Sequence, residues 1–570
     1  MKISDLKFEK LSWPPFVAIA ALAACLFTIR LTAPPNLLDQ DQENPAAYVL
    51  DAVKNGNWIC QRDLSGEITS KPPLYTWICA VVTLACGRIN LFALYLPGAL
   101  AALGTAWLVL AAGRRHFGNR AGWLAALATM LTAAGLKEFG LARTDGVFAF
   151  TVTAAALLGF RAWSRGGGWT WFWLMAAAAT LTKGPLGLVL AGGGLAACWW
   201  EKRSGQPLPL RGSHLAGLGL FLLITVGWFL LAYRQFGAAV SNKMIFEEFV
   251  GQATGTTVQT IPGTHIYQQP LYYLARAAPW SLLAYYGLWR VWKWPATETR
   301  VRRFERFLFC WFLVGLAIFS IAPHQRADHL WPLMPAGALI AGRELERLAQ
   351  GLRPSAFHRW VTLTVVVIAG GFSFYYFGPR ARRPVIRATV ALERLAEEIE
   401  RRGGKEFPLT HVDDPVALQI YLNTLCPRIT SERAAQLLRG PEPAFVAITD
   451  LEKLQAARQP DDPPIYTLLP SPGVAGRSPA SIMANRPGFV SADPIAFCFG
   501  SLFVRASGAR LVAATERGFW FTAIGKSAEV LIVNEASAPR KVRVCILESG
   551  AEHSQQRVLA KGETWRMVLP

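Results

Sequence analysis

The stretch NLFALYLPGALAALGTAWLVLAAGRRHFGNR, residues 90–120, joins a long apolar block directly to a basic loop. Residues 90–112 contain no charged side chain. A helix needs about 20 apolar residues to cross the hydrocarbon core of a bilayer. Arginines that follow such a block are typical of the cytoplasmic side of a membrane. The stretch therefore predicts a spanning helix that ends on the cytoplasmic face.

Similar blocks recur through the first two thirds of the chain. Of the 570 residues 52% are hydrophobic and 21 are Trp, which is typical of a multispanning membrane protein and unusual for a soluble enzyme. We predict about 11–13 transmembrane helices, with eleven spans near 14–33, 90–112, 121–137, 146–163, 168–182, 185–200, 215–235, 269–291, 307–323, 330–345 and 359–378. A further stretch, 72–87, is short for a span and is expected to lie partly in the outer leaflet.

The basic residues of the connecting loops set the orientation. With a cytoplasmic N-terminus, four Lys- and Arg-rich loops fall inside, namely 113–120, 201–212, 290–306 and 343–359. The net charge of +20 is thus a signature of topology, and we predict no nucleic-acid partner. The outward loops are 34–89, 138–145, the turn at Lys183, 236–268 and 324–329.

Two other sequence features exclude competing interpretations. LAAC at 22–25 resembles a lipoprotein cleavage box, but the apolar run continues past Cys25, which favours an uncleaved first helix. The nine Cys show no CxxC or Cys/His spacing typical of zinc. Cys426, Cys498 and Cys545, in the last third, allow at most one disulfide. We predict no required metal or other cofactor.

The texture of the chain changes near residue 380. RATVALERLAEEIERR (387–402) is an amphipathic helix, and FVAITD (445–450) contains a short buried strand. From about 495 the pattern is strand-like. We therefore predict a transmembrane domain over 1–380 and a soluble α/β plus β domain over 381–570, on the outer face. No nucleotide-binding GxGxxG or Walker A motif occurs.

Candidate chemistry gathers in the outward loops, at Asp39, Asp41, Glu43, Lys71, Arg143, Asp145 and Lys183. Ionisable groups at membrane depth are costly unless they are paired or used. Lys183 alone could be a helix-end lysine that reaches the interface, and Arg143 with Asp145 could be a local ion pair. Carboxylates and cations converging on one membrane face indicate a reaction.

A lipid-phosphate-linked donor suits this set of side chains. Its leaving phosphate is already an anion, so it needs cations rather than a general acid. Lys71, Lys183 and Arg143 fit that need. An incoming hydroxyl needs a carboxylate to accept its proton, which Asp41 or Asp145 provides. A donor of this kind also requires no nucleotide-binding loop.

Seven motifs in order carry a family resemblance: DQDQE (39–43), GNW (56–58), KPPLYTW (71–77), ARTD (142–145), LTKGP (181–185), PLYYLARAAPWSLL (270–283) and HLWPLMPAGALI (329–340). Together they resemble glycosyltransferase family 39 of the GT-C superfamily, which contains aminoarabinose lipid A transferases and protein O-mannosyltransferases. The resemblance covers roughly residues 10–345. It implies inverting transfer of a sugar from undecaprenyl phosphate to an envelope acceptor such as lipid A, at the periplasmic face of the bacterial inner membrane.

The resemblance also implies roles for individual residues. The family's base precedes the Trp of its GDW element by about seventeen residues, and this distance from Trp58 falls on Asp41. Asp145 matches the second-loop acid. The resemblance implies donor-phosphate contacts for Lys71, Lys183, Arg143 and Arg326, and supporting positions for Asp39, Glu43, His265 and Tyr75.

The sequence departs from the family around the implied base. Gln42 stands where the family has Glu, and Asn44 and Pro45 replace a basic residue and a Tyr. Gln252 occupies a loop position that is usually Arg. These differences leave the donor sugar open, and lipid A, another glycan or a protein all remain acceptors to be distinguished.

Two further classes of function compete with a glycosyltransferase. A transporter or flippase would also use intramembrane charge, but it should contain broken helices in an internal repeat, and no convincing duplication occurs. An outer interaction domain on an inactive anchor is the other alternative. The presence of Asp41, Lys71, Asp145 and Lys183 argues against it.

Overall fold

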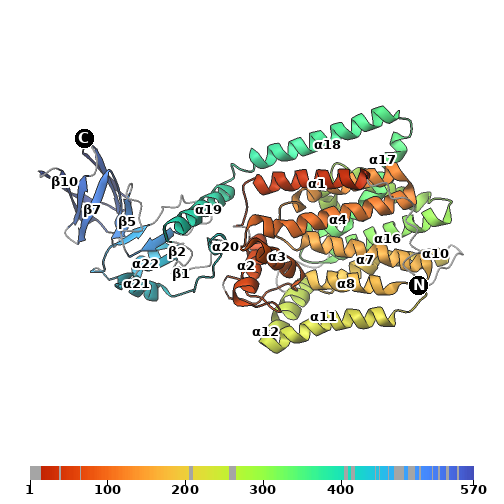
Figure 1. The fold of residues 1–570 in the computed structure, drawn as a ribbon, viewed down its shortest axis with the longest axis horizontal. Helices are drawn as coiled ribbons and strands as arrows, with labels where there is room; N and C mark the ends of the chain where they lie inside the picture. The colour runs from red at the N-terminus through yellow and green to blue at the C-terminus, as the bar shows by residue number, and fades with distance from the viewer. Residues whose placement is uncertain are drawn as a thin grey trace. The chain divides into compact units, whose positions relative to one another are not determined.

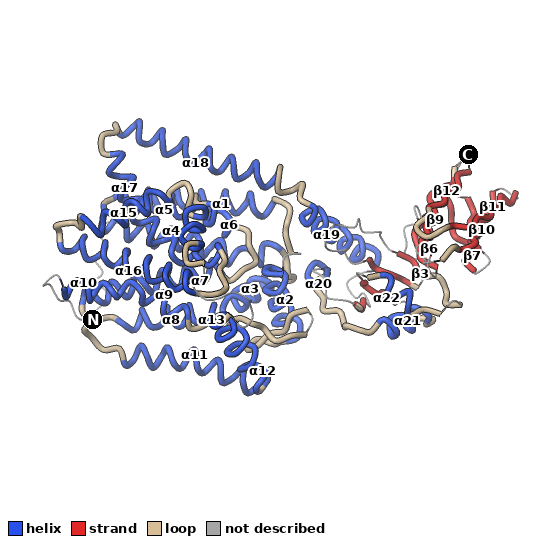
Figure 2. Tube along the Cα trace, turned by 180° about the vertical axis from the view of Figure 1, so that it is seen from behind, coloured by secondary structure: helices blue, strands red, loops and turns tan. Residues whose placement is uncertain are grey.

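The chain divides into two compact units, Met1–Ala381 and Arg382–Pro570. The computed structural model describes residues 14–37, 40–64, 66–203, 210–255, 265–403, 409–412, 418–442, 444–448, 450–459, 461–467, 481–485, 495–499, 502–515, 518–523, 527–534, 538–548 and 551–569. The first unit is helical, and the second contains the strands (Figure 2). The boundary lies close to residue 380, where the sequence pattern predicts the end of the transmembrane domain.

Six helices of the described chain are long and apolar enough to cross a membrane, and they form the frame of the first unit in Figure 1. They are α1 (Pro14–Thr32), α4 (Leu91–Phe117), α7 (Asp145–Arg165), α11 (Leu215–Phe236), α16 (Thr299–Ile321) and α18 (Pro354–Phe377). Each overlaps a predicted span. The molecule is a multispanning helical membrane protein, as the apolar blocks predicted.

The other predicted spans are short or interrupted. Span 168–182 is the single helix α8 (Trp169–Lys183), whereas four others are divided. The divided spans form α5 (Asn119–Met130) with α6 (Ala133–Glu138); α9 (Leu186–Gly192) with η2 (Gly193–Ala196) and α10 (Ala197–Arg203); α14 (Gln268–Arg276) with α15 (Ser281–Lys293); and η4 (Ala327–Leu333) with α17 (Met334–Ala349). Two interruptions meet, since the Ala133 amide donates to the Ala278 carbonyl at 3.3 Å. Backbone freed by one break is thereby satisfied by the other.

The first outward loop is folded around two helices, α2 (Gln40–Asn55) and α3 (Leu74–Cys86). Buried Asp51 organises it, because its carboxylate accepts from the Arg62 amide at 2.7 Å and from Asn57 Nδ2 at 3.1 Å. The Trp58 carbonyl accepts from Trp77 Nε1 at 2.6 Å, which ties the GNW motif to α3. The two motifs of this loop thus share one rigid support.

After α11 the chain enters a region of short helices that lies near the first loop. These are α12 (Ala238–Ser241), the π-helix η3 (Asn242–Val250) and α13 (Gly251–Thr254). Trp228 Nε1, on α11, donates to the Ile59 carbonyl at 2.9 Å. Figure 1 places α2, α3 and α12 at the same end of the bundle. The described parts of two loops predicted to face outward, 34–89 and 236–268, therefore lie at that end.

Small residues allow the central helices to approach closely. A Cβ atom added to Gly113 of α4 would lie 2.6 Å from the Cα of Gly122 in α5, so these helices meet backbone to backbone. Gly342 of α17 packs in the same way on Ala125. Larger side chains fill the rest of the core, including fully buried Trp163 and Trp311.

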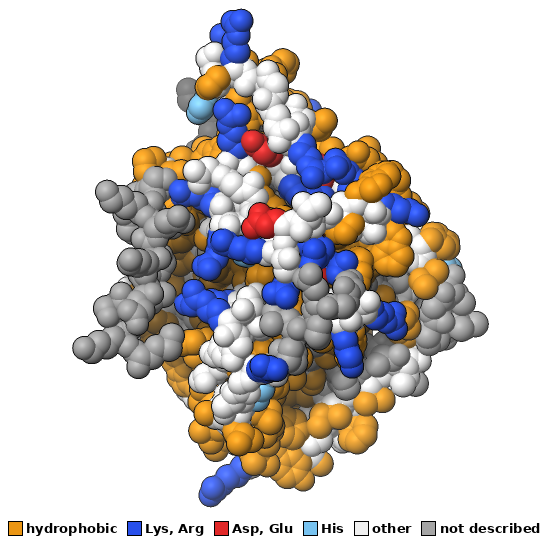
Figure 3. Space-filling view, turned by 90° about the vertical axis from the view of Figure 1, so that its right-hand side faces the viewer, with side chains coloured by type: hydrophobic (Ala, Val, Ile, Leu, Met, Phe, Trp, Pro, Cys, Tyr) orange, Lys and Arg blue, Asp and Glu red, His pale blue; other side chains and the backbone are white. Residues whose placement is uncertain are grey.

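Buried ion pairs hold the opposite end of the bundle. Glu201 is fully buried and accepts from Arg306 at 2.7 Å, and Arg343 binds Glu344 at 2.5 Å and also Glu305. Figure 3 looks at this end, where α10 lies, and shows many Lys and Arg side chains and few acids. The exposed basic residues of the loops predicted to be cytoplasmic include Arg115, Lys202, Arg203, Lys293, Arg300, Arg353 and Arg359.

The second unit begins with α19 (Pro384–Gly403) and contains two sheets. The eight-stranded sheet has the order β1-β2-β4-β3-β5-β6-β9-β12, and the four-stranded sheet has the order β11-β10-β8-β7. The strands are β1 (Leu409–His411), β2 (Phe445–Ile448), β3 (Ile465–Thr467), β4 (Ser481–Ala484), β5 (Ile495–Phe499), β6 (Leu502–Ser507), β7 (Ala509–Thr515), β8 (Gly518–Ala523), β9 (Ala528–Asn534), β10 (Arg540–Glu548), β11 (Ala551–Leu559) and β12 (Thr564–Leu569).

The larger sheet contains strands from both the predicted α/β part and the predicted strand-rich part that begins near residue 495. β1 and β2 pair in parallel, as in an α/β layer, and the short helices α20 (Leu418–Tyr421), α21 (Ser431–Arg439) and α22 (Leu451–Ala456) occur among these first strands. β5, β6, β9 and β12 then continue the same sheet with antiparallel pairing. Cys426 and Cys545 are both buried free thiols.

Candidate active site

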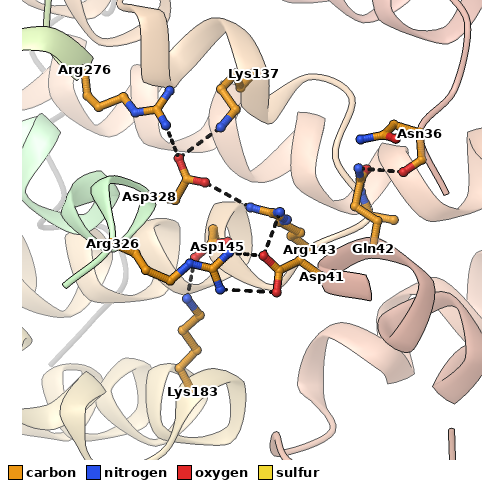
Figure 4. Close-up of polar contacts among 11 residues, drawn as sticks. Asn36, Asp41, Gln42, Lys137, Arg143, Asp145, Lys183, Arg276, Arg326 and Asp328 are labelled. Atoms are coloured by element: carbon orange, nitrogen blue, oxygen red, sulfur yellow. Dashed lines mark hydrogen bonds and ion pairs between the residues drawn. The ribbon is translucent and has the colours of Figure 1, made fainter. Parts of the chain in front are cut away.

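Asp41 lies in the first turn of α2 and accepts hydrogen bonds from two arginines in distant parts of the chain (Figure 4). Its Oδ2 accepts from Arg143 Nη2 at 2.9 Å and also from Arg326 Nη2. Its Oδ1 accepts from Arg326 Nη1 at 3.2 Å. The residue implied as the base is therefore the centre of an ion-pair network.

Asp328, two residues after Arg326, is a second carboxylate centre. Its Oδ2 accepts from Arg143 Nη1 at 3.0 Å, so Arg143 bridges the two aspartates. Its Oδ1 lies 2.9 Å from Lys137 Nζ and 3.2 Å from Arg276 Nη2. Three cations thus bind Asp328, and one of them, Arg143, also binds Asp41.

Two further ion pairs contain the remaining cations of the sequence analysis. Lys183, at the end of α8, binds Asp145 in the first turn of α7, and its Nζ lies 5.7 Å from the centre of the Phe148 ring. Lys71, just before α3, lies 2.5 Å from Glu248 of η3. Both lysines therefore have a carboxylate partner in this structure.

These groups line one cavity of about 380 Å³. Asp41, Lys71, Arg143, Asp145, Lys183 and Arg326 all contribute to its wall, together with Asn44, Pro45, Tyr48, Ser70, Thr144, Phe148, Leu186, Glu248, Phe319, His324, Asp328 and His329. The two catalytic and four phosphate-binding positions predicted from the sequence therefore meet at one place. Asn44 and Pro45, which depart from the family, lie in the same wall.

Three of the residues predicted to support the site, Glu43, Tyr75 and His265, lie outside the cavity wall. Glu43 is buried and Tyr75 donates its hydroxyl to the Leu94 carbonyl at 2.8 Å, and neither lines the cavity. His265 is exposed beside Tyr267, with the two ring centres 6.2 Å apart. Asp39 lies outside the described residues, as does the side chain of Gln252.

Sequence reasoning missed several groups that the fold brings to the site, namely Lys137, Glu248, Arg276, His324, Asp328 and His329. The segment HQRADH (324–329) contained a usable signal, because two histidines and an acid accompany Arg326 in a short outward loop. Glu248 had no comparable signal. It is one of two adjacent acids, and only the fold brings it to Lys71.

The network determines the ionisation of the acids outside the spanning helices. Burial raises the pKa of Asp41, but the hydrogen bond from Arg326 and the charge of Arg143 outweigh it, and the pKa lies below its ordinary value. Burial acts in the same direction on Asp328, yet Lys137, Arg276 and Arg143 lower its pKa to about 2. Both acids are carboxylates at neutral pH.

The histidines of the cavity have the opposite charge state. Burial and then the charge of Lys183 lower the pKa of His329 to about 3. Burial, together with Arg326 and Lys71, lowers the pKa of His324. Both rings are neutral at pH 7. The positive charge of the cavity therefore comes from lysines and arginines.

A resident metal ion finds no ready ligand set in the described part of the chain. No three His, Cys, Asp or Glu side chains there lie close enough together to hold one. The carboxylates of the cavity are instead matched to cations. The site is built to bind an anion among arginines and lysines and to offer a carboxylate beside it.

Known proteins match the chain in part of its sequence and in most of its fold. Residues 70–244 match the family model described as dolichyl-phosphate-mannose-protein mannosyltransferase. Two relatives are undecaprenyl phosphate-α-4-amino-4-deoxy-L-arabinose arabinosyl transferases. That of Pseudomonas fluorescens is 25% identical over 56% of this chain, and that of Proteus mirabilis is 26% identical over 56%. The matches span 56% and 58% of the relatives' lengths.

A solved structure matches the fold over more of the chain than the two relatives match its sequence. The crystal structure of ArnT from Cupriavidus metallidurans bound to undecaprenyl phosphate superposes with a TM-score of 0.63 at 18% identity. The superposition covers 84% of this chain and 99% of that one. The chain is therefore a multi-pass membrane protein with the fold of that ArnT structure, and its sequence is similar to the mannosyltransferase family model and to the two arabinosyl transferases.

Proposed function

We propose that the protein is an inverting glycosyltransferase that uses a sugar carried on undecaprenyl phosphate. The observation that carries this proposal is the single cavity in which Asp41 stands among Lys71, Arg143, Lys183 and Arg326. Cations suit a phosphate leaving group and the carboxylate suits an incoming hydroxyl. The names of the two arabinosyl transferase relatives support the same donor class.

The reaction uses these groups as follows. The acceptor oxygen attacks the anomeric carbon of the donor sugar while the bond from that carbon to the phosphate oxygen breaks. Asp41 accepts the acceptor's proton, and the cations stabilise the departing undecaprenyl phosphate. Attack opposite to the leaving group inverts the anomeric configuration. No metal or cofactor takes part in this scheme.

Lipid A, or another envelope glycan, is the acceptor class we propose, with the cavity facing the periplasm at the inner membrane of a bacterium. The basic face in Figure 3 lies at the other end of the bundle, which agrees with a cytoplasmic position for that face. The second unit, reached after α18, would then also be periplasmic. A protein hydroxyl is the acceptor that the test must exclude.

Reconstitution tests the proposal directly. The purified full chain would be mixed with undecaprenyl phosphate carrying aminoarabinose, or a hexose, and with lipid A or a reporter protein, and the products would be weighed by mass spectrometry. We expect addition of one sugar to lipid A. Sugar found on the protein reporter instead would replace the acceptor assignment, and transport of intact donor without any transfer would refute the enzyme.

Lys71→Met should raise the KM for the donor about tenfold or more and change kcat less, because a charge-assisted bond to phosphate contributes roughly 1.5–3 kcal/mol. Lys71 is one of the more accessible cations, with 36% of its side chain exposed. Steady-state kinetics against donor concentration measures the effect. An unchanged donor KM would remove Lys71 from the phosphate site.

The pH profile should be flat on its acid side. Asp41 is ionised above its lowered pKa, and His329, whose pKa is about 3, stays neutral throughout this range. We expect kcat/KM for the donor to stay constant between about pH 5 and 8 and to fall only below about pH 4, where Asp41 gains a proton. A loss of activity centred near pH 6.5 would instead point to a histidine as the base.

A further inference from the structure

Arginines contact both oxygens of Asp41 in this structure. Oδ1 accepts from Arg326, and Oδ2 accepts from both Arg326 and Arg143. A base needs a lone pair within reach of the acceptor's proton and a pKa that is not strongly depressed. Each arginine bond occupies a lone pair and lowers the pKa of the carboxyl, so release of one arginine makes Asp41 a stronger base.

The two arginines differ in how firmly they are held. Arg143 is 11% exposed, and its second nitrogen is bound to Asp328, which Lys137 and Arg276 hold from the other side. Arg326 is 43% exposed and lines the cavity. Figure 4 shows the two guanidinium groups reaching Asp41 from separate elements. Arg326 is therefore the arginine that can move.

We propose that the donor phosphate and Asp41 exchange Arg326. Arg326 pairs with Asp41 in this structure. When the donor is bound, Arg326 pairs with the phosphate, while Asp328 keeps Arg143 on Asp41. This inference rests on the proposed function and adds the order of events to it. A phosphate group accepts the planar guanidinium fork as well as a carboxylate does, so the exchange replaces one charge-assisted pair with another.

The exchange couples two steps of catalysis. Arg326 reaches the leaving group when the donor binds, and the same movement uncovers a lone pair of Asp41. The base is thus strengthened when a donor is present, which predicts that productive turnover begins with donor binding. Asp328 acts here as a positioning residue, because it touches Arg143 rather than the reacting atoms.

A double-mutant cycle on binding tests the exchange without requiring turnover. The full chain in lipid nanodiscs would be titrated with undecaprenyl phosphate at fixed pH and salt, as wild type, Asp41→Asn, Arg326→Gln and the double variant. We expect Asp41→Asn to bind on the order of five- to tenfold more tightly, because Arg326 no longer has a competing carboxylate. In the Arg326→Gln background the same change should have little effect.

Asp328→Asn is the matched control, because it removes the same charge from the same cavity, whereas the Asp328 carboxylate pairs with Lys137, Arg143 and Arg276 and acts on Arg326 through charge alone. General electrostatics would make its effect on binding the same with Arg326 or Gln at position 326. The exchange is overturned if Asp41→Asn leaves affinity unchanged, weakens it, or tightens it equally in both backgrounds. Wild-type sugar transfer is measured in parallel, so loss of the exchange and loss of the function are distinguishable.

Wild-type kinetics provides a second readout that needs no variant. The pH profile of kcat/KM reports the free enzyme, and that of kcat reports the loaded enzyme. Loss of Arg326 and arrival of an anion both raise the pKa of Asp41. The acid limb of kcat should therefore lie at higher pH than that of kcat/KM for the donor. Coincident limbs would contradict the exchange.

Discussion

Replacing Asp41 by Asn should reduce sugar transfer by a factor of about 10²–10⁴, the usual contribution of a positioned general base. Asparagine keeps the shape of the side chain. With its oxygen placed where Oδ2 lies, it can still accept from Arg143 and Arg326, and it loses the bond that Oδ1 accepts from Arg326 Nη1, so most of the site should remain assembled. What is lost is the ability to take the acceptor's proton. Transfer measured at saturating donor and acceptor isolates this loss in kcat.

A suitable control is Glu67→Gln, in the same outward loop. Glu67 is 65% exposed, pairs with Lys243 at 3.2 Å and does not line the cavity. It should transfer sugar at the wild-type rate. If Asp41→Asn matched that rate, the base assignment would be wrong, and Asp145 would be the next carboxylate to test.

Lys183→Ala should destabilise the folded membrane unit by about 3 kcal/mol, because it leaves the Asp145 carboxylate buried without its cation. Only 18% of the lysine side chain and 12% of the aspartate side chain are exposed. The amide groups at the start of α7 offset part of the loss. Thermal unfolding of the purified protein, followed by Tm in one detergent, measures the change.

The double variant Lys183→Met/Asp145→Asn separates stability from chemistry. It removes both charges of the pair, so it should recover most of the lost Tm while donor use stays impaired. Lys71→Met should leave Tm close to the wild-type value, because its ion pair with Glu248 is partly exposed and contributes little stability. Equal losses of Tm in Lys71→Met and Lys183→Ala would contradict this distinction.

The lysines and arginines of this cavity therefore divide into two kinds. The side chains of Lys71 and Arg326 are accessible, whereas those of Lys183 and Arg143 are largely enclosed beside their carboxylate partners. A phosphate-binding role was predicted for all four from the sequence. In the structure the four side chains differ in how much of each is exposed to solvent, and the predictions above follow from that difference.

Hydropathy and local pattern were enough to identify the membrane unit. A charge-free block such as residues 90–112 has one stable state in a bilayer, since only a helix satisfies its backbone there. The six long helices overlap six of the predicted spans for that reason. The interruptions were harder to predict, because groups from distant segments satisfy the freed backbone, as the Ala278 carbonyl does for Ala133.

The sequence by itself determined the membrane class and six residues of the cavity wall, because these depend on composition and on short motifs such as KPPL and ARTD. The tertiary structure decided the partners of those residues. Asp41 and Arg326 are separated by 285 positions, and Lys71 and Glu248 by 177. Ion pairing acts through space, and no local pattern records which charge the folded chain brings to another.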